Sequence, residues 1–115
     1  MAVPPGAAGQ VVGTGVVFFT EDSAFLDANA QAIAAEAAAL ANAHPWARVR
    51  VRGFTAPGGS PGFNAALAET RARAVSDALR ERGVPRERIA LEARPVVPFE
   101  LIPTESRRVE VVVGG

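Results

Sequence analysis

Hydrophobic and polar residues follow one another along this chain with two periods, one typical of strands and one typical of helices. The strictest alternation lies at residues 48–52, where arginine and valine take turns. It predicts a half-buried strand with its valines facing inward. Short runs rich in apolar residues predict further strands over residues 13–19, 88–94 and 107–113.

Two longer segments carry the helical period. The first helix is predicted over residues 28–43, with Asp27 as its N-cap and the His44-Pro45 step as its end. The second is predicted over residues 63–82, followed by Gly83 at the position where helices often carry a glycine. The positions expected to face the core recur at helical spacing: Leu26, Ala30, Ile33, Ala37, Leu40, Leu67, Ala68, Ala72, Val75, Ala78 and Leu79.

The order strand–helix–strand–helix–strand–loop–strand predicts an α/β fold. Two helices would pack on one face of a mixed sheet of about four strands. Because strands joined through a helix tend to run parallel, parallel pairings are expected between them. Four valines would then lie buried between the sheet and the helices: Val49, Val51, Val109 and Val111.

Length and composition narrow the class of protein. With 115 residues, 49% of them hydrophobic, the chain can form one packed domain, expected over residues 13–115 after a flexible lead-in at 1–12. Twelve arginines balance twelve acidic residues, which argues against a nucleic-acid partner held by bulk charge. Cysteine does not occur, so disulfides and thiolate chemistry are excluded. No apolar stretch is long enough to span a membrane.

The first residues lack the basic and apolar regions of a secretory signal. Either a leader has been removed, or the protein is not exported by that route.

Three regions of the chain carry a specific combination of residues, and the central region consists of two stretches. Residues 18–26 read FFTEDSAFL, residues 53–59 read GFTAPGG, residues 64–72 read NAALAETRA, and residues 107–111 read RRVEV. In order and spacing they resemble the opening strand, the G-H-T-D-x-x-G…N-x-x-L-S-x-x-R-A signature and the R-R-V-E-I strand of the OmpA C-terminal-like family. The resemblance covers about residues 14–113, and the central motif is its specific part.

The resemblance implies a β-α-β-α-β-β fold and a non-catalytic bacterial module that binds the peptide stem of peptidoglycan, usually at diaminopimelate. It implies the periplasm or cell envelope, in association with the outer membrane. In the family, an aspartate of the T-D step takes the ligand's ammonium group, and the arginine of the R-A step takes its carboxylate. The candidate ligand-binding residues on this basis are Arg71, which matches that arginine, together with Thr55, Asn64 and Arg107.

Several positions depart from the family pattern. Ala56 stands where the aspartate is expected, Phe54 replaces the histidine, Ala68 a serine and Ser106 an asparagine. A zwitterion needs a charge of each sign at a fixed separation, so the ligand clamp is expected to be degraded and binding weak or lost. The alternative is a scaffold or protein-interaction domain in a larger envelope-associated or injection-type assembly, which could also be cytoplasmic.

No residues point to catalysis. The chain has no evident nucleophile–base pair, metal-ligand cluster or cofactor loop, so no enzyme, metal or cofactor is predicted. Residues 57–62 are expected to form a turn-rich loop, and His44 is expected at a helix end and not as a base or ligand. The expected partners are peptidoglycan or a protein of a larger assembly, with no nucleic acid and no membrane insertion by this chain.

Four further features admit two interpretations each. Arg71 is either a carboxylate receptor or a helix-surface arginine paired with an acid. The arginines of residues 48–52 either meet an anionic partner or form a solvated face balanced by Glu92 and Glu110, and the zero net charge favours the second. Trp46 is expected to pack in the core, whereas Phe99 fits the core and an interface equally well.

Overall fold

A computed structural model describes residues 9–55, 60–96 and 107–115 of the chain. Its elements follow the predicted order closely. They are the strand β1 (Val11–Phe18), the helix α1 (Ala28–Ala43), the strand β2 (Val49–Thr55), the helix α2 (Pro61–Glu81), the short 3-10 turn η1 (Arg86–Arg88), and the strands β3 (Ile89–Val96) and β4 (Arg108–Gly114).

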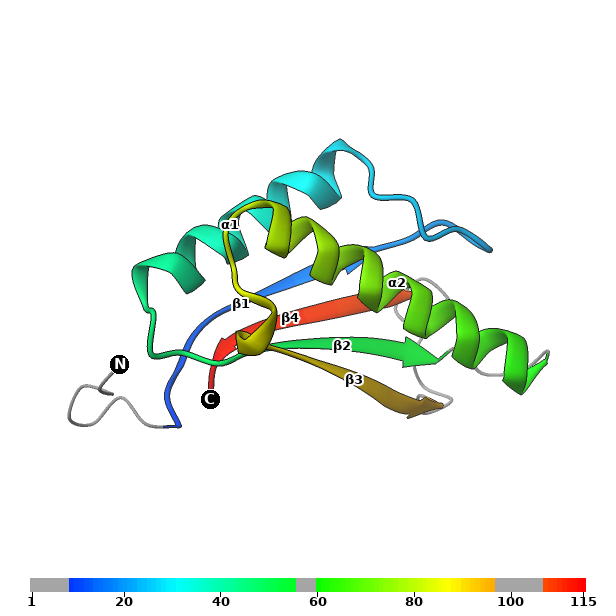
Figure 1. Ribbon diagram of the computed structural model, residues 1–115. Helices are drawn as coiled ribbons and strands as arrows, with labels where there is room; N and C mark the ends of the chain where they lie inside the picture. Colours follow the sequence, from blue (N-terminus) through cyan, green and yellow to red (C-terminus); the bar gives the residue numbers. More distant parts are fainter. Residues whose placement is uncertain (1–8, 56–59, 97–106) are drawn as a thin grey trace.

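The helices α1 and α2 lie side by side on one face of the sheet, and no described helix covers the other face (Figure 1). The sheet has four strands in the order β1-β4-β2-β3. β2 and β3 are parallel, whereas β4 is antiparallel to both of its neighbours. The predicted fold class, two helices on one face of a mixed sheet, is therefore confirmed.

One predicted pairing is wrong. β1 and β2 are joined through α1, yet they are not neighbours, because β4 lies between them. The register places Val111 of β4 opposite both Gly15 of β1 and Val51 of β2. Strands connected by a helix can leave room for another strand, and here the last described strand fills it. Only β2 and β3 form the expected parallel pair.

The core lies between the sheet and the helices, where the alternation of the strands placed it. Val49, Val51, Val109 and Val111 are all 0% exposed, as predicted. The two helices supply mainly alanine to this layer, and small side chains let them approach the strands closely. The partly buried residues packed against the core are Val12, Leu26, Ile33, Leu40, Trp46 and Ile89.

At Gly53 the backbone of β2 lies close against α2. A Cβ atom added to Gly53 would lie 2.5 Å from the backbone oxygen of Ala68 and 3.3 Å from the Cβ of Ala72. Such a distance to backbone leaves no room for a side chain. This glycine therefore sets how near α2 lies to the end of β2, where the candidate site begins.

The helix ends explain the observed boundaries. Asp27 Oδ1 accepts a hydrogen bond from Ala30 N at 2.8 Å, the N-cap contact predicted for α1. α2 begins at Pro61 and not at Phe63, so the predicted loop is wrong over its last two residues. The reason is that Ser60 Oγ caps Phe63 N at 3.3 Å, and proline suits the first helical position.

α2 ends as the glycine predicts. Gly83 has φ +95°, a left-handed conformation that costs glycine little. Its N–H donates to Arg80 O at 3.0 Å, and Val84 N donates to Leu79 O at 3.2 Å. These two bonds form a Schellman motif, which closes the helix and turns the chain towards β3.

Candidate ligand-binding site

Arg71 lies on the face of α2 that is turned to the connection between β1 and α1. It is only 3% exposed. Its Nε donates to the carbonyl oxygen of Ser23 at 2.7 Å, and its Nη2 donates to that of Thr20 at 3.0 Å. Its Cζ also lies 5.3 Å from the ring centroid of Phe19. The interpretation of Arg71 as a helix-surface arginine is therefore wrong.

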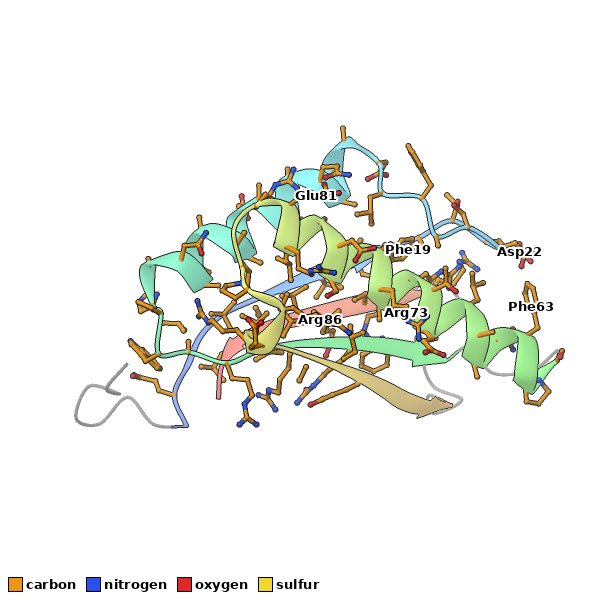
Figure 2. All side chains as sticks on the ribbon, in the orientation of Figure 1. Phe19, Asp22, Phe63, Arg73, Glu81 and Arg86 are labelled. Atoms are coloured by element: carbon orange, nitrogen blue, oxygen red, sulfur yellow. The ribbon has the colours of Figure 1, made fainter. Side chains whose placement is uncertain are left out.

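The connection that receives Arg71 is a tight turn at residues 20–23. Ser23 N donates to Thr20 O at 3.2 Å, which closes the turn. Asp22 has φ +58° at the third position of this turn, a conformation that aspartate tolerates better than most residues. The turn directs two carbonyl groups at one guanidinium; Figure 2 labels Asp22 in this turn and Phe19, which directly precedes it.

Arg107 lies close enough to Arg71 for the two guanidinium groups to repel. Burial lowers the pKa of Arg71, the charge of Arg107 lowers that pKa further, and the charge of Asp22 partly offsets both effects. Phe19 N donates to Arg107 O at 2.9 Å, which ties the start of β4 to the end of β1. The structure thus brings together two of the predicted site residues, Arg71 and Arg107.

The Nε of Arg107 is buried and has no hydrogen-bond partner among the described residues. A buried donor without a partner costs free energy, and a second cation beside it adds to that cost. An anion placed here would relieve both costs. In chemical terms this corner of the domain, between the end of β1, the middle of α2 and the start of β4, favours a carboxylate or a phosphate.

The other two predicted site residues are placed less fully. Asn64 is half-buried and lies seven positions before Arg71, which puts the two residues on the same face of α2. Thr55 is the last residue of β2, and its side chain lies outside the described residues, as do Ala56, Phe99 and Ser106. The predictions made for these four residues therefore stay predictions.

The residues that hold Arg71 could not be predicted from the sequence. Thr20 and Ser23 act through their backbone carbonyl groups, which every residue has, so no side-chain pattern reveals them. Phe19 was grouped with the first strand only for its hydrophobicity. Its position under a guanidinium gives it a second role as a flat contact surface for Arg71.

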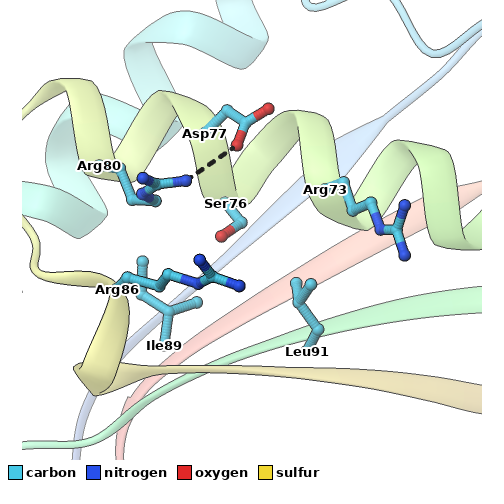
Figure 3. Close-up of a pocket in the computed structure, with 7 residues that line it drawn as sticks. All are labelled: Arg73, Ser76, Asp77, Arg80, Arg86, Ile89 and Leu91. Atoms are coloured by element: carbon cyan, nitrogen blue, oxygen red, sulfur yellow. Dashed lines mark ion pairs between the residues drawn. The ribbon is translucent and has the colours of Figure 1, made fainter.

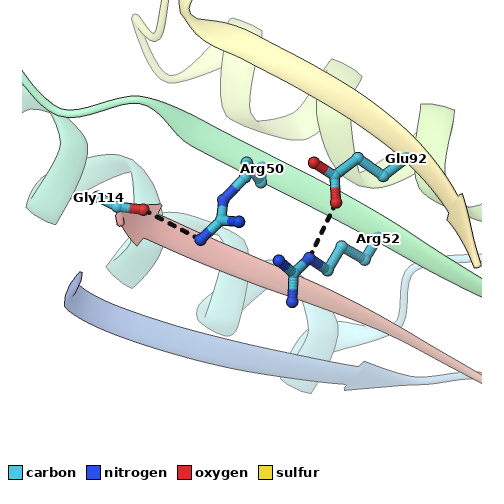
Figure 4. A network of polar contacts seen from close by, with 4 residues as sticks. All are labelled: Arg50, Arg52, Glu92 and Gly114. Atoms are coloured by element: carbon cyan, nitrogen blue, oxygen red, sulfur yellow. Dashed lines mark hydrogen bonds and ion pairs between the residues drawn. The ribbon is translucent and has the colours of Figure 1, made fainter. Parts of the chain in front are cut away.

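The open face of the sheet carries the arginine row of β2. Arg52 Nε lies 3.0 Å from Glu92 Oε1 on β3, whereas Arg50 Nη2 lies 3.5 Å from the carbonyl oxygen of Gly114 (Figure 4). Glu110 pairs with Arg108 of its own strand at 3.3 Å. The balanced-face interpretation is thus confirmed for Arg52 and Glu92, and Glu110 balances a different arginine from those expected.

Neither a metal-binding cluster nor a membrane-spanning helix occurs among the described residues. Within residues 9–55, 60–96 and 107–115, no three histidine or acidic side chains are grouped so that they could hold a metal ion. No helix in that part of the chain is long and apolar enough to cross a bilayer. His44 Nδ1 lies 2.9 Å from Leu40 O, and the residue caps the end of α1 as expected.

Several solved structures have the same fold. The peptidoglycan-associated lipoprotein of Burkholderia pseudomallei is 27% identical, with a TM-score of 0.78 over 86% of this chain and 89% of that one. The OmpA-like domain of FopA1 from Francisella tularensis subsp. tularensis is 22% identical, with a TM-score of 0.76 over 88% and 71%. The periplasmic domain of Helicobacter pylori MotB is 20% identical, with a TM-score of 0.68 over 91% and 76%.

Curated protein sequences gave no match to this chain. The model of the OmpA family matches residues 18–95, which is most of the chain and includes both helices, β2 and the central motif. The predicted resemblance is confirmed: this chain belongs to the OmpA family.

Proposed function

We propose that this domain is a non-catalytic module that associates with peptidoglycan in the bacterial cell envelope. Membership of the OmpA family supports this function, as does the likeness to a structure named a peptidoglycan-associated lipoprotein. The likeness to a periplasmic domain supports an envelope location. The observation that carries the proposal is the convergence of Arg71 and Arg107 at a buried corner that favours an anion.

The chemistry of the site is recognition of a carboxylate on the stem peptide. A guanidinium has five N–H donors in a rigid plane. Thr20 and Ser23 engage two N–H groups of Arg71, so its orientation is set before a ligand arrives. A receptor that is already ordered loses little conformational entropy on binding. Holding a carboxylate in this way requires no base and no nucleophile, because no bond is broken.

Binding to diaminopimelate is expected to be weak, because Ala56 offers no partner for the ammonium group. Loss of one charge-assisted hydrogen bond in a partly buried site costs about 1.5–3 kcal/mol, or roughly one to two decades of affinity. The residues proposed to contact the ligand remain Arg71, Thr55, Asn64 and Arg107, with Arg71 as the carboxylate receptor.

Calorimetric or NMR titration with diaminopimelate tests this arrangement. The Ala56→Asp variant should bind more tightly than the natural chain by about one to two decades. Adding Arg107→Gln in that background should reduce the gain, whereas adding Arg73→Gln should not, because Arg73 is exposed and pairs with Glu69. Tight binding by the natural chain would show that the clamp is intact.

A scaffold or protein-interaction domain in a larger assembly is the second candidate. Three phenylalanines favour it, since Phe25 is 77% exposed, Phe63 54% and Phe18 49%. Exposed aromatic side chains often serve as anchors in protein interfaces. A pull-down on purified sacculi separates the two candidates. Retention on sacculi that is lost in an Arg107→Gln variant supports peptidoglycan binding, whereas no retention of the natural chain favours the scaffold.

A further inference from the structure

A groove of about 350 Å³ lies on the other side of α2, between that helix and β3. Arg73, Ser76 and Arg80 of α2 form one wall, and Arg86 of η1 closes one end. Ile89 and Leu91 of β3 form the floor (Figure 3). Arg73 follows Arg71 by two positions, so the two side chains leave α2 about 200° apart. The groove is therefore separate from the proposed peptidoglycan site.

The groove is positively charged in a chain whose net charge is zero. Three arginines line it against one acid, Asp77. Arg80 pairs with Asp77 at 3.7 Å and Arg73 pairs with Glu69 at 2.6 Å, but all four side chains are at least half exposed, so both pairs are weak. The guanidinium group of Arg86 has neither a hydrogen bond nor an ion pair with the described part of the chain.

The floor of the groove is the edge of the sheet. β3 is the outermost strand, so one row of its backbone N–H and C=O groups has no strand beside it among the described residues. Leu91, on this strand, is 48% exposed although it is a large apolar residue. A free strand edge beside an exposed apolar side chain is a ready template for another strand.

We propose that this groove binds an extended acidic peptide segment of a partner protein, which adds to β3 as an extra strand. The backbone of the segment would pair with Ile89–Glu92, and its side chains would alternate between the two faces of the sheet. Those on the helix side would meet the arginines.

The spacing of the charges also fits. Arg73 and Arg80 are about 10.5 Å apart along the helix axis. Acidic residues at alternate positions of a strand recur about every 6.8 Å, so two or three of them would span the distance between these arginines.

The combination of features favours a peptide over other polyanions. A phosphodiester polymer could use the arginines, but it could neither pair with a strand edge nor gain from covering Leu91. A peptide with glutamates at alternate positions uses the charge and the free backbone together, and the methylene groups of those glutamates, which point to the helix side, cover Leu91. At an exposed site the ion pairs, the apolar contact and the backbone hydrogen bonds each contribute little free energy, so the affinity would depend on their sum.

NMR titration of the isotope-labelled chain with a synthetic peptide of about ten residues, alternating Glu and Val, tests the proposal. The largest shifts should occur at the amides of Ile89–Glu92, which should also exchange more slowly with solvent. Arg86→Gln should weaken binding about two- to fivefold, and the triple change of Arg73, Arg80 and Arg86 to Gln by tenfold or more. Arg48→Gln is the control, since Arg48 is exposed and does not line the groove.

Two further probes separate strand addition from simple charge attraction. A peptide of equal charge with proline at alternate positions cannot pair with β3 and should not bind. Polyphosphate should bind more weakly than the Glu–Val peptide and leave the β3 amides unprotected. Equal binding of the proline peptide, no shifts in β3, or no effect of the arginine changes would overturn the proposal. None of these results depends on binding to peptidoglycan.

Discussion

Arg71 Nε lies 2.7 Å from the carbonyl oxygen of Ser23, so one hydrogen bond joins α2 to a turn that lies 48 positions earlier in the chain. A second bond, from Nη2 to Thr20 O, spans 51 positions. The arginine that the family pattern assigns to the ligand thus also fixes the connection between β1 and α1. Removing it would affect both binding and local structure, so the two effects must be measured separately.

Arg71→Lys should destabilise the domain although the charge is kept. An ammonium group cannot present two donors in one plane to the two carbonyl groups of the turn. Hydrogen bonds to a charged group are each worth about 1.5–3 kcal/mol, and we expect a loss of that order in the free energy of unfolding. Urea denaturation measures it. Arg73→Lys, on the exposed side of the same helix, should stay within about 0.5 kcal/mol of the natural chain.

Hydrogen exchange shows where in the chain Arg71→Lys acts. Faster exchange at Ser23 and Phe25, whose amides are bonded within the turn, would follow from a loosened turn. If Arg71→Lys left both stability and exchange unchanged, the arginine would not hold this turn.

Gly53→Ala should be costly because a Cβ at this position would meet the backbone of Ala68 at 2.5 Å. Neither backbone can yield without moving α2, and overpacking of this kind costs about 1–3 kcal/mol. Gly62→Ala is the matched control, since a Cβ there meets nothing within 4 Å, and alanine is favoured over glycine within a helix. Chemical denaturation should show a lower free energy of unfolding than that of the natural chain for Gly53→Ala and a higher one for Gly62→Ala. Equal stabilities would contradict this account of Gly53.

Asp27→Ala should destabilise α1 by removing the acceptor for Ala30 N. The expected loss is about 0.5–2 kcal/mol in the free energy of unfolding. Asp27→Asn keeps an acceptor oxygen at the same position and should lose no more than a few tenths of a kcal/mol, roughly the difference between good N-cap residues. A large loss in the asparagine variant would mean that the charge of Asp27, and not its cap bond, stabilises the helix.

The ion pair between Arg52 and Glu92 should make a measurable contribution to stability. Its side chains are 23% and 33% exposed, and they lie directly opposite each other on β2 and β3. A double-mutant cycle with alanine should give a coupling of about 0.5–1 kcal/mol that decreases as salt is added. The pair between Arg73 and Glu69 is more exposed, and the same cycle should give about 0.3–0.5 kcal/mol. A stronger coupling for the helical pair would reverse this order.

The sequence predicted what depends on local pattern. The alternation at residues 48–52 and the helical spacing of small apolar residues placed the elements of the core to within a few positions, because burial of one face imposes those periods. The start of α2 was missed because proline and glycine occur both in turns and in the first turn of a helix. Ser60 decided between the two, and its capping role depends on the backbone geometry around it.

The site was predicted less completely than the fold. Family signatures pointed to Arg71 and Arg107, and the structure brings the two together. Neither the bonds from Arg71 to backbone carbonyls nor the place of β4 between β1 and β2 could be predicted, since both depend on contacts between segments far apart in the chain.

The central place of β4 bears on the order in which the protein can fold during synthesis. β1 pairs with a strand that follows it by 90 positions at Phe18↔Arg108 and by 103 at Val11↔Gly114, and β2 gains its second neighbour only when the same strand arrives. Until residues 108–114 have left the ribosome, β1 can pair with no other strand of the sheet. In the nascent chain α1 and the 20–23 turn can already contact α2, whereas β1 is expected to join the sheet only when β4 is available.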